Sequence, residues 1–130
     1  MGDSILVNGK TVTAKKNLDC KSDNVLYVAQ CKICNELQES TYGGQTGQPF
    51  HKRTNGHRAC FKIEDEDAIE KSALALHSKI EHSDDDFTIE NFKFVLYDQC
   101  RPRDLNRRES RLIGELRTNV LGLNRMNVQK

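Results

Sequence analysis

Two tyrosines, an arginine and a histidine are the residues of this chain whose types and spacing point to chemistry. Tyr27 lies in an apolar run, and Tyr42 opens the glycine-rich segment that follows. Arg53 and His57 come next, and their spacing places both on one face of a helix. A guanidinium binds phosphate oxygens through a planar fork, and a phenol can give or accept a proton. These groups, beside a glycine-rich backbone, suit chemistry on a phosphodiester.

Each of these four residues also has a purely structural interpretation. Tyrosine favours strands, so Tyr27 and Tyr42 could be ordinary strand residues. Arg53 and His57 could form a satisfied pair at the edge of the core. Phenylalanines mark the same helical face as inward, however, and an arginine and a histidine on an inward face are unusual. The joint occurrence of all four residues therefore favours a functional site.

A carboxylate lies inside the apolar stripe of the last expected helix, where Glu109 shares a face with three leucines, Leu105, Leu112 and Leu116. Burying a carboxylate is costly unless it is paired, bound to a cation or close to water. A single carboxylate with open coordination positions suits Mg²⁺, which keeps most of its waters and takes a phosphate oxygen. The alternative is an ion pair with an arginine, of which the sequence offers Arg53, Arg108 and Arg111.

Cysteines and histidines provide a second group. Cys31 and Cys34 have the Cys-x2-Cys spacing of zinc ligands, and His77 and His82 lie about one helical turn apart. We expect these four residues to bind a structural Zn²⁺ ion, in a zinc knuckle between two strands. The alternative is a buried pair of free cysteines with solvated histidines. The remaining cysteines could replace a ligand: Cys20, Cys60 and Cys100. A redox role is disfavoured because the pair joins two strands, whereas a thioredoxin-like motif begins a helix.

The elements that must position these groups follow from the hydrophobic pattern. Strands are expected at 25–31, 39–46 and 92–97, and helices at 49–61, 68–81 and 104–118. The second helix has an apolar stripe of Ile69, Ala73, Leu76 and Ile80. A short connection favours an antiparallel pair for the first two strands. The order predicts an α+β fold, with a small central antiparallel three-stranded sheet flanked by helices.

The organisation outside this core is simpler. Residues 1–22 are expected to form an N-terminal hairpin, with Asn8-Gly9 as its turn, or a loose arm. Residues 23–130 make one domain. The net charge is only +1, but it is +4 over 1–62, −8 over 63–98 and +5 over 99–130. A fold that brings both ends to one face would have a basic side able to bind phosphates.

Cysteine usage and hydropathy bear on the compartment. Five cysteines is an odd number, no apolar signal region leads the chain, and no apolar run approaches the length of a membrane span. We expect reduced thiols in a nuclear or cytoplasmic protein that makes no membrane contact. A secreted disulfide fold is the less favoured alternative.

As a set, these residues resemble the GIY-YIG nuclease domain over about residues 24–126. The first tyrosine motif corresponds to Val25-Leu26-Tyr27, and the second to Tyr42-Gly43-Gly44. The later matches are the Arg-x3-His of Arg53 and His57, the metal-binding glutamate at Glu109 and the late asparagine at Asn124. The chain departs from the family pattern at Gly43, where an aliphatic residue is usual, and at Val25, which replaces a glycine.

Within that family the chain is similar to the Penelope-like retroelement endonuclease. Cysteines between the two tyrosine motifs and histidines downstream mark that group, and Cys31, Cys34, His77 and His82 fit this description. Thr46 and the stretch Asn55-Gly56-His57-Arg58 are also similar. The resemblance implies DNA as the partner, a reverse transcriptase fused to the domain or acting with it, and no small-molecule substrate.

The resemblance further implies a metal-dependent DNA endonuclease with Mg²⁺ or Mn²⁺ on Glu109. Tyr27 would be the general base, although a free phenol, with a pKa of about 10, needs a lowered pKa or a metal-linked proton path. Arg53 would neutralise charge on the phosphate, Tyr42 and His57 would orient water or help the proton leave, and Asn124 would hold the site by hydrogen bonds. Two alternatives remain: a non-catalytic zinc-stabilised nucleic-acid-binding module, and a protein-interaction domain that uses the acidic middle.

Overall fold

The computed structural model describes residues 4–7, 10–15, 17–33, 41–62, 65–70, 72–81 and 87–116. Three of the residues singled out above lie outside these ranges: Cys34, His82 and Asn124. The expected turn at Asn8-Gly9 lies outside them as well. No helix in the described ranges has both the length and the apolar character needed to span a bilayer.

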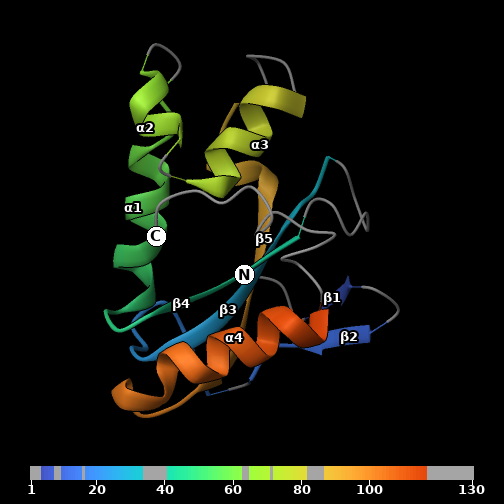
Figure 1. The fold of residues 1–130 in the computed structure, drawn as a ribbon, viewed down its shortest axis with the longest axis vertical. Helices are drawn as coiled ribbons and strands as arrows, with labels where there is room; N and C mark the ends of the chain where they lie inside the picture. The colour runs from blue at the N-terminus through green and yellow to red at the C-terminus, as the bar shows by residue number, and fades with distance from the viewer. Residues whose placement is uncertain are drawn as a thin grey trace.

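The central sheet has the size and sense that the sequence predicts. β3 (Val25–Cys31) pairs antiparallel with β4 (Thr41–Thr46) on one side and with β5 (Phe92–Gln99) on the other (Figure 1). The strand order β4-β3-β5 makes β4 an edge strand. The expected α+β fold, a three-stranded antiparallel sheet flanked by helices, is therefore confirmed. β3 is buried along its whole length because other elements cover both of its faces.

The helices are α1 (Phe50–Ala59), α2 (Glu66–Glu70), α3 (Ala73–Glu81) and α4 (Leu105–Leu116), with short 3₁₀ turns at Ile89–Asn91 and Pro102–Asp104. α1 and α4 lie within a few residues of the ranges predicted for the first and last helices. The leucine stripe of α4 is also confirmed where side chains are described, since Leu105, Glu109 and Leu112 are all buried.

The prediction of a single helix at 68–81 is wrong, because this segment forms two helices, α2 and α3, and Ser72 lies between them. The Ser72 hydroxyl accepts a hydrogen bond from the Ala75 N–H at 3.3 Å, and the Ser72 carbonyl accepts one from the Leu76 N–H at 2.9 Å. Ser72 is thus the N-cap of α3. The break changes which side chains face inward, so the predicted stripe is wrong at its end: Ile80 is 62% exposed, whereas His77 is buried.

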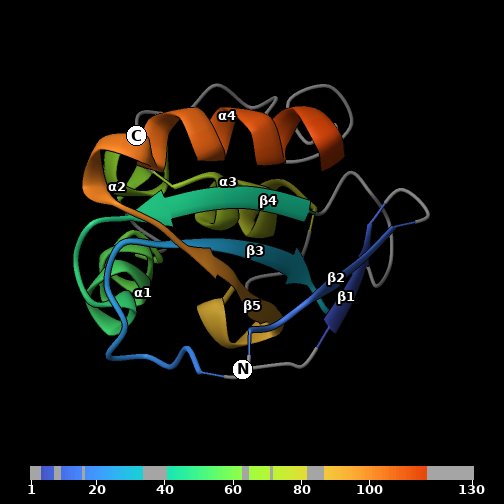
Figure 2. The same cartoon turned by 90° about the horizontal axis from the view of Figure 1, so that it is seen from below.

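Different elements cover the two faces of the sheet (Figures 1 and 2). On one face, Tyr27 and Ala29 pack with side chains of α1 and α3 such as Phe50 and Leu74. On the other face, Leu26 and Val28 pack with α4 and the N-terminal strands; this cluster also contains Ile5, Val12, Val95 and Leu112. The alternation of side chains along β3 thus produces two separate core clusters.

The N-terminal segment forms the hairpin that was one of the two expectations for it. β1 (Ser4–Val7) and β2 (Lys10–Thr13) pair antiparallel, with Ile5 opposite Val12. Just after β2, the Lys15 N–H donates to the Leu96 carbonyl at 2.9 Å, which ties the segment to β5.

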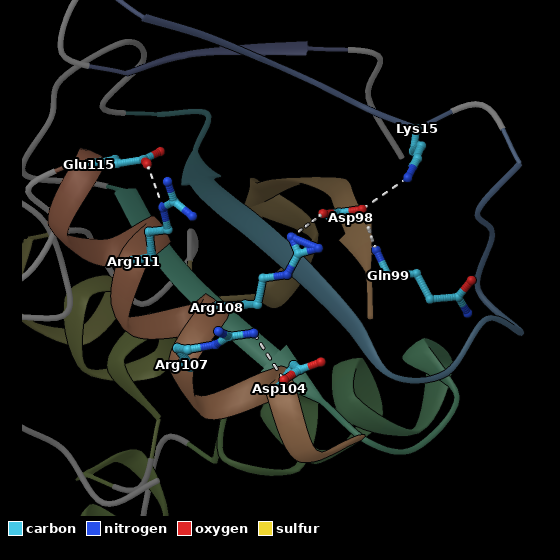
Figure 3. A network of polar contacts seen from close by, with 8 residues as sticks. All are labelled: Lys15, Asp98, Gln99, Asp104, Arg107, Arg108, Arg111 and Glu115. Carbon is cyan, nitrogen blue, oxygen red and sulfur yellow. Dashed lines mark hydrogen bonds and ion pairs between the residues drawn. The ribbon is translucent and has the colours of Figure 1, made fainter. Parts of the chain in front are cut away.

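Asp98 on β5 connects this segment to α4 (Figure 3). Its carboxylate accepts hydrogen bonds from Lys15 Nζ at 3.0 Å, from Arg108 Nη1 at 3.2 Å and from the Gln99 N–H at 2.8 Å. Burial raises the pKa of Asp98, but these donors outweigh it and hold the pKa below its ordinary value. Exposed ion pairs each contribute little free energy. The pair between Asp98 and Arg108 instead helps to orient α4 on the sheet, and Glu109 is the next residue of that helix.

Candidate active site at the edge of the sheet

Tyr27 is the centre of a group of buried polar side chains. Its ring is fully buried and packs against Phe50, with the ring centroids 5.2 Å apart. Its hydroxyl lies 3.0 Å from His57 Nε2 and accepts a hydrogen bond from Arg53 Nε at 3.2 Å. The prediction that Arg53 and His57 share the inward face of one helix is confirmed by these contacts.

Tyr42 lies against the same group. Its ring centroid is 6.2 Å from that of Tyr27 and 6.0 Å from that of His57. Its hydroxyl has hydrogen-bonding interactions with both Arg53 and Tyr27. The Arg53 guanidinium therefore contacts both phenols, although the two tyrosines come from neighbouring strands.

Glu109 reaches this group from α4. A cleft of about 410 Å³ is lined by residues of β4, α1 and α4, namely Tyr42, Gln45, Arg53, Asn106, Glu109 and Ser110; we call it the edge cleft. Glu109 is 8% exposed and lines the cleft together with Tyr42 and Arg53. Its charge adds to the raised pKa of both tyrosines. The structure thus brings together every predicted catalytic residue except Asn124, which lies outside the described residues.

The arginines proposed as structural partners of Glu109 bond to other groups. Arg108 pairs with Asp98, and Arg111 pairs with Glu115 at 3.3 Å (Figure 3). Arg53 donates its Nε–H to Tyr27. Arg108 therefore links α4 to β5, and Arg111 forms a pair within α4.

Three lining residues of the edge cleft were not singled out by the sequence analysis: Gln45, Asn106 and Ser110. Asn106 and Ser110 share a helical face with Glu109, so a search for polar residues along that face would have found them. Gln45 donates a short hydrogen bond to the Asn106 side chain, which joins β4 to α4 across the cleft.

A larger cavity, of about 540 Å³, lies beside Phe50 and contains none of the predicted catalytic residues. Phe50, Phe92 and the partly buried Phe94 form much of its wall, and the charged groups are Lys32, Lys93 and the Arg58–Glu90 ion pair. Size alone does not identify a site. The smaller edge cleft has the convergent polar groups that a reaction requires.

The edge strand β4 has two consecutive glycines, Gly43 and Gly44, so it has no side chain at these positions on either face. Gly44 pairs with Tyr27, and a Cβ atom on Gly44 would lie 2.5 to 2.9 Å from atoms of the tyrosine ring. Gly43 faces α4, where a Cβ would lie 3.4 Å from the Ile113 side chain and 3.7 Å from that of Leu112. Gly43 therefore has room for a methyl group against α4, whereas Gly44 has none against Tyr27.

Burial dominates the electrostatics of the phenols. It raises the pKa of Tyr27, and the neighbouring Tyr42 raises it further, while Arg53 acts in the opposite direction. Burial and Glu109 likewise raise the pKa of Tyr42 against the effect of Arg53. For Arg53, burial lowers the pKa but the two phenols outweigh it, so the net shift is upward. The protein alone thus shifts Tyr27 away from the lowered pKa that a general base needs.

His57 is neutral at physiological pH. Burial, with a smaller effect from the Arg53 charge, lowers its pKa from 6.5 to about 3. The imidazole is 4% exposed, and its other nitrogen, Nδ1, lies 2.8 Å from the Ser72 hydroxyl. Its role is therefore that of a neutral hydrogen-bonding group.

We expect this buried histidine to make the fold sensitive to acid. The unfolded chain binds a proton at His57 below pH 6.5 that the folded chain binds only near pH 3. Stability from this group is therefore present above pH 6.5 and is lost as the pH falls toward 3. The loss between pH 7.5 and pH 5 should be about 2 kcal/mol in the free energy of unfolding. Urea denaturation at a series of pH values measures it.

His57→Gln should remove most of this slope, because glutamine does not titrate. His51→Gln is the matched control, since His51 is an exposed histidine of the same helix. Equal slopes in the parent and in His57→Gln would contradict the assignment.

The predicted zinc ligands are placed only in part. Cys31 is buried at the end of β3 opposite Phe92, and the ring of buried His77 lies 6.1 Å from the Phe92 ring. Cys34 and His82 lie outside the described residues. Among the residues that are described, no three His, Cys, Asp or Glu side chains gather to hold a metal ion. None of the four described cysteines forms a disulfide, and of these Cys20 is exposed.

No family model, curated protein or solved structure matches this chain. Any assignment of function therefore depends on the motif residues and on the geometry of the edge cleft.

Proposed function

We propose that this chain is a divalent-metal-dependent DNA endonuclease that hydrolyses phosphodiester bonds at the edge cleft. The observation that supports this most is the meeting of Arg53 and Glu109 in one cleft. They come from helices on opposite faces of the sheet. A cation and a carboxylate beside two phenols form the set that phosphodiester hydrolysis uses.

Arg53 would bind the scissile phosphate. A guanidinium has five N–H donors, so its hydrogen bonds to the two phenols do not use them all. Because its position is held by Tyr27, the positive charge is already in place when charge develops on the phosphate.

Glu109 would hold the metal, and its donor type fits this role. A single largely buried carboxylate at the wall of a cleft is a suitable ligand for Mg²⁺ or Mn²⁺, which keep several waters. A divalent cation there would supply positive charge to the phosphate and to the leaving oxygen.

The proton acceptor is the most demanding part of the proposal. In hydrolysis the attacking water loses a proton, a phosphorus–oxygen ester bond breaks, and the leaving oxygen gains a proton. Tyr27 as acceptor requires a phenolate, which burial opposes and which Arg53 favours. Tyr42 would orient the water, and Asn124 would complete the site.

The motif set extends this proposal to the Penelope-like retroelement endonuclease, with a reverse transcriptase fused to it or acting with it in the nucleus or cytoplasm. A structural Zn²⁺ ion on Cys31, Cys34, His77 and His82 belongs to the same proposal, and its support is the residue types and spacing in the sequence. Four protein ligands would leave no open coordination position for chemistry. Metal analysis well below one zinc per chain would contradict this site.

A non-catalytic module that binds nucleic acid is the second candidate. The raised pKa of Tyr27 favours it, since a phenol that stays protonated is a poor base. Such a module would bind DNA with steep salt dependence and leave it uncut.

The deciding experiment incubates the chain with supercoiled plasmid, with and without Mg²⁺. We expect nicked or linear plasmid only when Mg²⁺ is present, and none from Arg53→Ala. Arg107→Ala is the matched control, because Arg107 is an exposed arginine that pairs with Asp104. No cleavage by the parent in Mg²⁺ or Mn²⁺ would refute nuclease activity. Equal cleavage by parent and Arg53→Ala would refute the assigned role of Arg53.

A further inference from the structure

Ser72 lies between α2 and α3, and its hydroxyl contacts His57, one of the buried polar side chains around Tyr27. Ser72 is 1% exposed. Its oxygen accepts the hydrogen bond from the Ala75 N–H that caps α3, and it lies 2.8 Å from His57 Nδ1. The same hydroxyl therefore serves a helix terminus and a predicted site residue.

Counting protons decides the direction of the hydrogen bond between Ser72 and His57. A hydroxyl has one proton to donate, and the Ala75 N–H does not accept it. If His57 Nδ1 carried a proton and donated it to Ser72, the hydroxyl proton would have no acceptor among the described residues. Buried donors are almost always satisfied. The arrangement that satisfies Ser72 and His57 has the Ser72 hydroxyl donating to an unprotonated Nδ1. The Tyr27 hydroxyl proton is then left for the Tyr42 oxygen, with which Tyr27 also interacts.

This direction fixes the tautomer of His57. A neutral imidazole has one ring proton, so an unprotonated Nδ1 leaves that proton on Nε2. Nε2 lies 3.0 Å from the Tyr27 oxygen, to which Arg53 Nε also donates at 3.2 Å. The Tyr27 oxygen then accepts two N–H donors. Both donors favour the phenolate over the phenol, because hydrogen bonds to a charged form stabilise it.

We propose that Ser72 is a positioning residue that holds His57 as a hydrogen-bond donor to Tyr27 and thereby favours the phenolate needed for proton acceptance. The catalytic part of this inference rests on the proposed nuclease function. In the other tautomer, His57 Nε2 would instead accept the Tyr27 proton and would hold the residue as a phenol. Because Ser72 is the N-cap of α3 and not a residue within a continuous helix, its hydroxyl can contact both the Ala75 N–H and His57.

Nitrogen-15 NMR of the histidine rings tests the hydrogen-bond direction without any cleavage assay. A protonated ring nitrogen and an unprotonated one resonate far apart. We expect His57 in the parent protein to have its proton on Nε2 and none on Nδ1. A proton on Nδ1 in the parent would overturn the proposal, and this measurement requires no variant.

Ser72→Asp is the sharpest variant. Aspartate is a good N-cap, so the hydrogen bond to Ala75 can be kept. An ionised carboxylate only accepts hydrogen bonds, so His57 Nδ1 should gain a proton. Ser72→Thr keeps a hydroxyl and should keep the parental tautomer. Ser72→Ala removes the donor without adding volume, and it serves if the aspartate variant does not fold.

Plasmid cleavage tests the positioning role. We expect Ser72→Asp and Ser72→Ala to cleave about 10- to 100-fold more slowly than the parent, the range found when groups that orient site residues are removed. Ser72→Thr should cleave at the parental rate. Parental cleavage by a variant whose His57 tautomer has changed would overturn the role of Ser72. A parent that shows the Nε2 tautomer but cuts no DNA would refute the nuclease proposal and leave the hydrogen-bond direction supported.

Discussion

Glu109→Gln is expected to slow plasmid cleavage about 10³-fold or more, because the variant keeps the shape of the side chain and removes its charge. A neutral amide is a weak ligand for Mg²⁺, which prefers carboxylate oxygens. The carboxylate is largely buried in α4, beside Asn106 and Ser110, and the amide fits the same space. The rate is measured from the conversion of supercoiled to nicked plasmid at saturating Mg²⁺.

Glu115→Gln is the control for this experiment. It removes the same charge from the same helix, but Glu115 is exposed and pairs with Arg111 (Figure 3). We expect it to cleave at the parental rate. Thermal unfolding of both variants separates a loss of chemistry from a loss of fold. If Glu109→Gln cut plasmid as fast as Glu115→Gln, the carboxylate would have no part in catalysis.

Gly44→Ala is expected to damage both stability and cleavage, because its methyl group would occupy the space of the Tyr27 ring. The ring is fully buried between Phe50 and Tyr42, so it cannot simply turn away. Forcing a methyl group into such a place costs about 1–3 kcal/mol in the free energy of unfolding. A displaced Tyr27 hydroxyl would lose its geometry with Arg53, and a misplacement of this kind costs roughly 100-fold in rate.

Gly43→Ala provides a control one residue away. Its methyl group would lie at ordinary contact distance from Ile113 and Leu112. It should leave cleavage unchanged and stabilise the fold by about 0.5 kcal/mol, since alanine loses less chain entropy than glycine. Urea denaturation and plasmid cleavage measure the two effects. Similar losses at both positions would show that the strand, and not the Tyr27 ring, requires glycine.

The residue pattern was sufficient for features that depend on neighbours within one element. Side chains repeat every two residues in a strand and about every 3.6 in a helix. These periods predict that Arg53 and His57 share a face and that Glu109 lies in a buried stripe, and the structure confirms both. The same reasoning failed at Ser72, because a helical stripe gives no sign that a serine will cap a new helix instead of continuing the old one.

Only the tertiary structure could bring Glu109 to the tyrosines. α4 and α1 lie on opposite faces of the sheet, and side chains of both line the cleft beside the edge strand β4. The absence of a side chain at Gly44 leaves the space that the Tyr27 ring occupies. The raised pKa of Tyr27 and the lowered pKa of His57 were equally out of reach, since burial causes both. Periodicity reports which way a side chain points. Strand order and the packing of distant segments decide what it meets there and how much water remains.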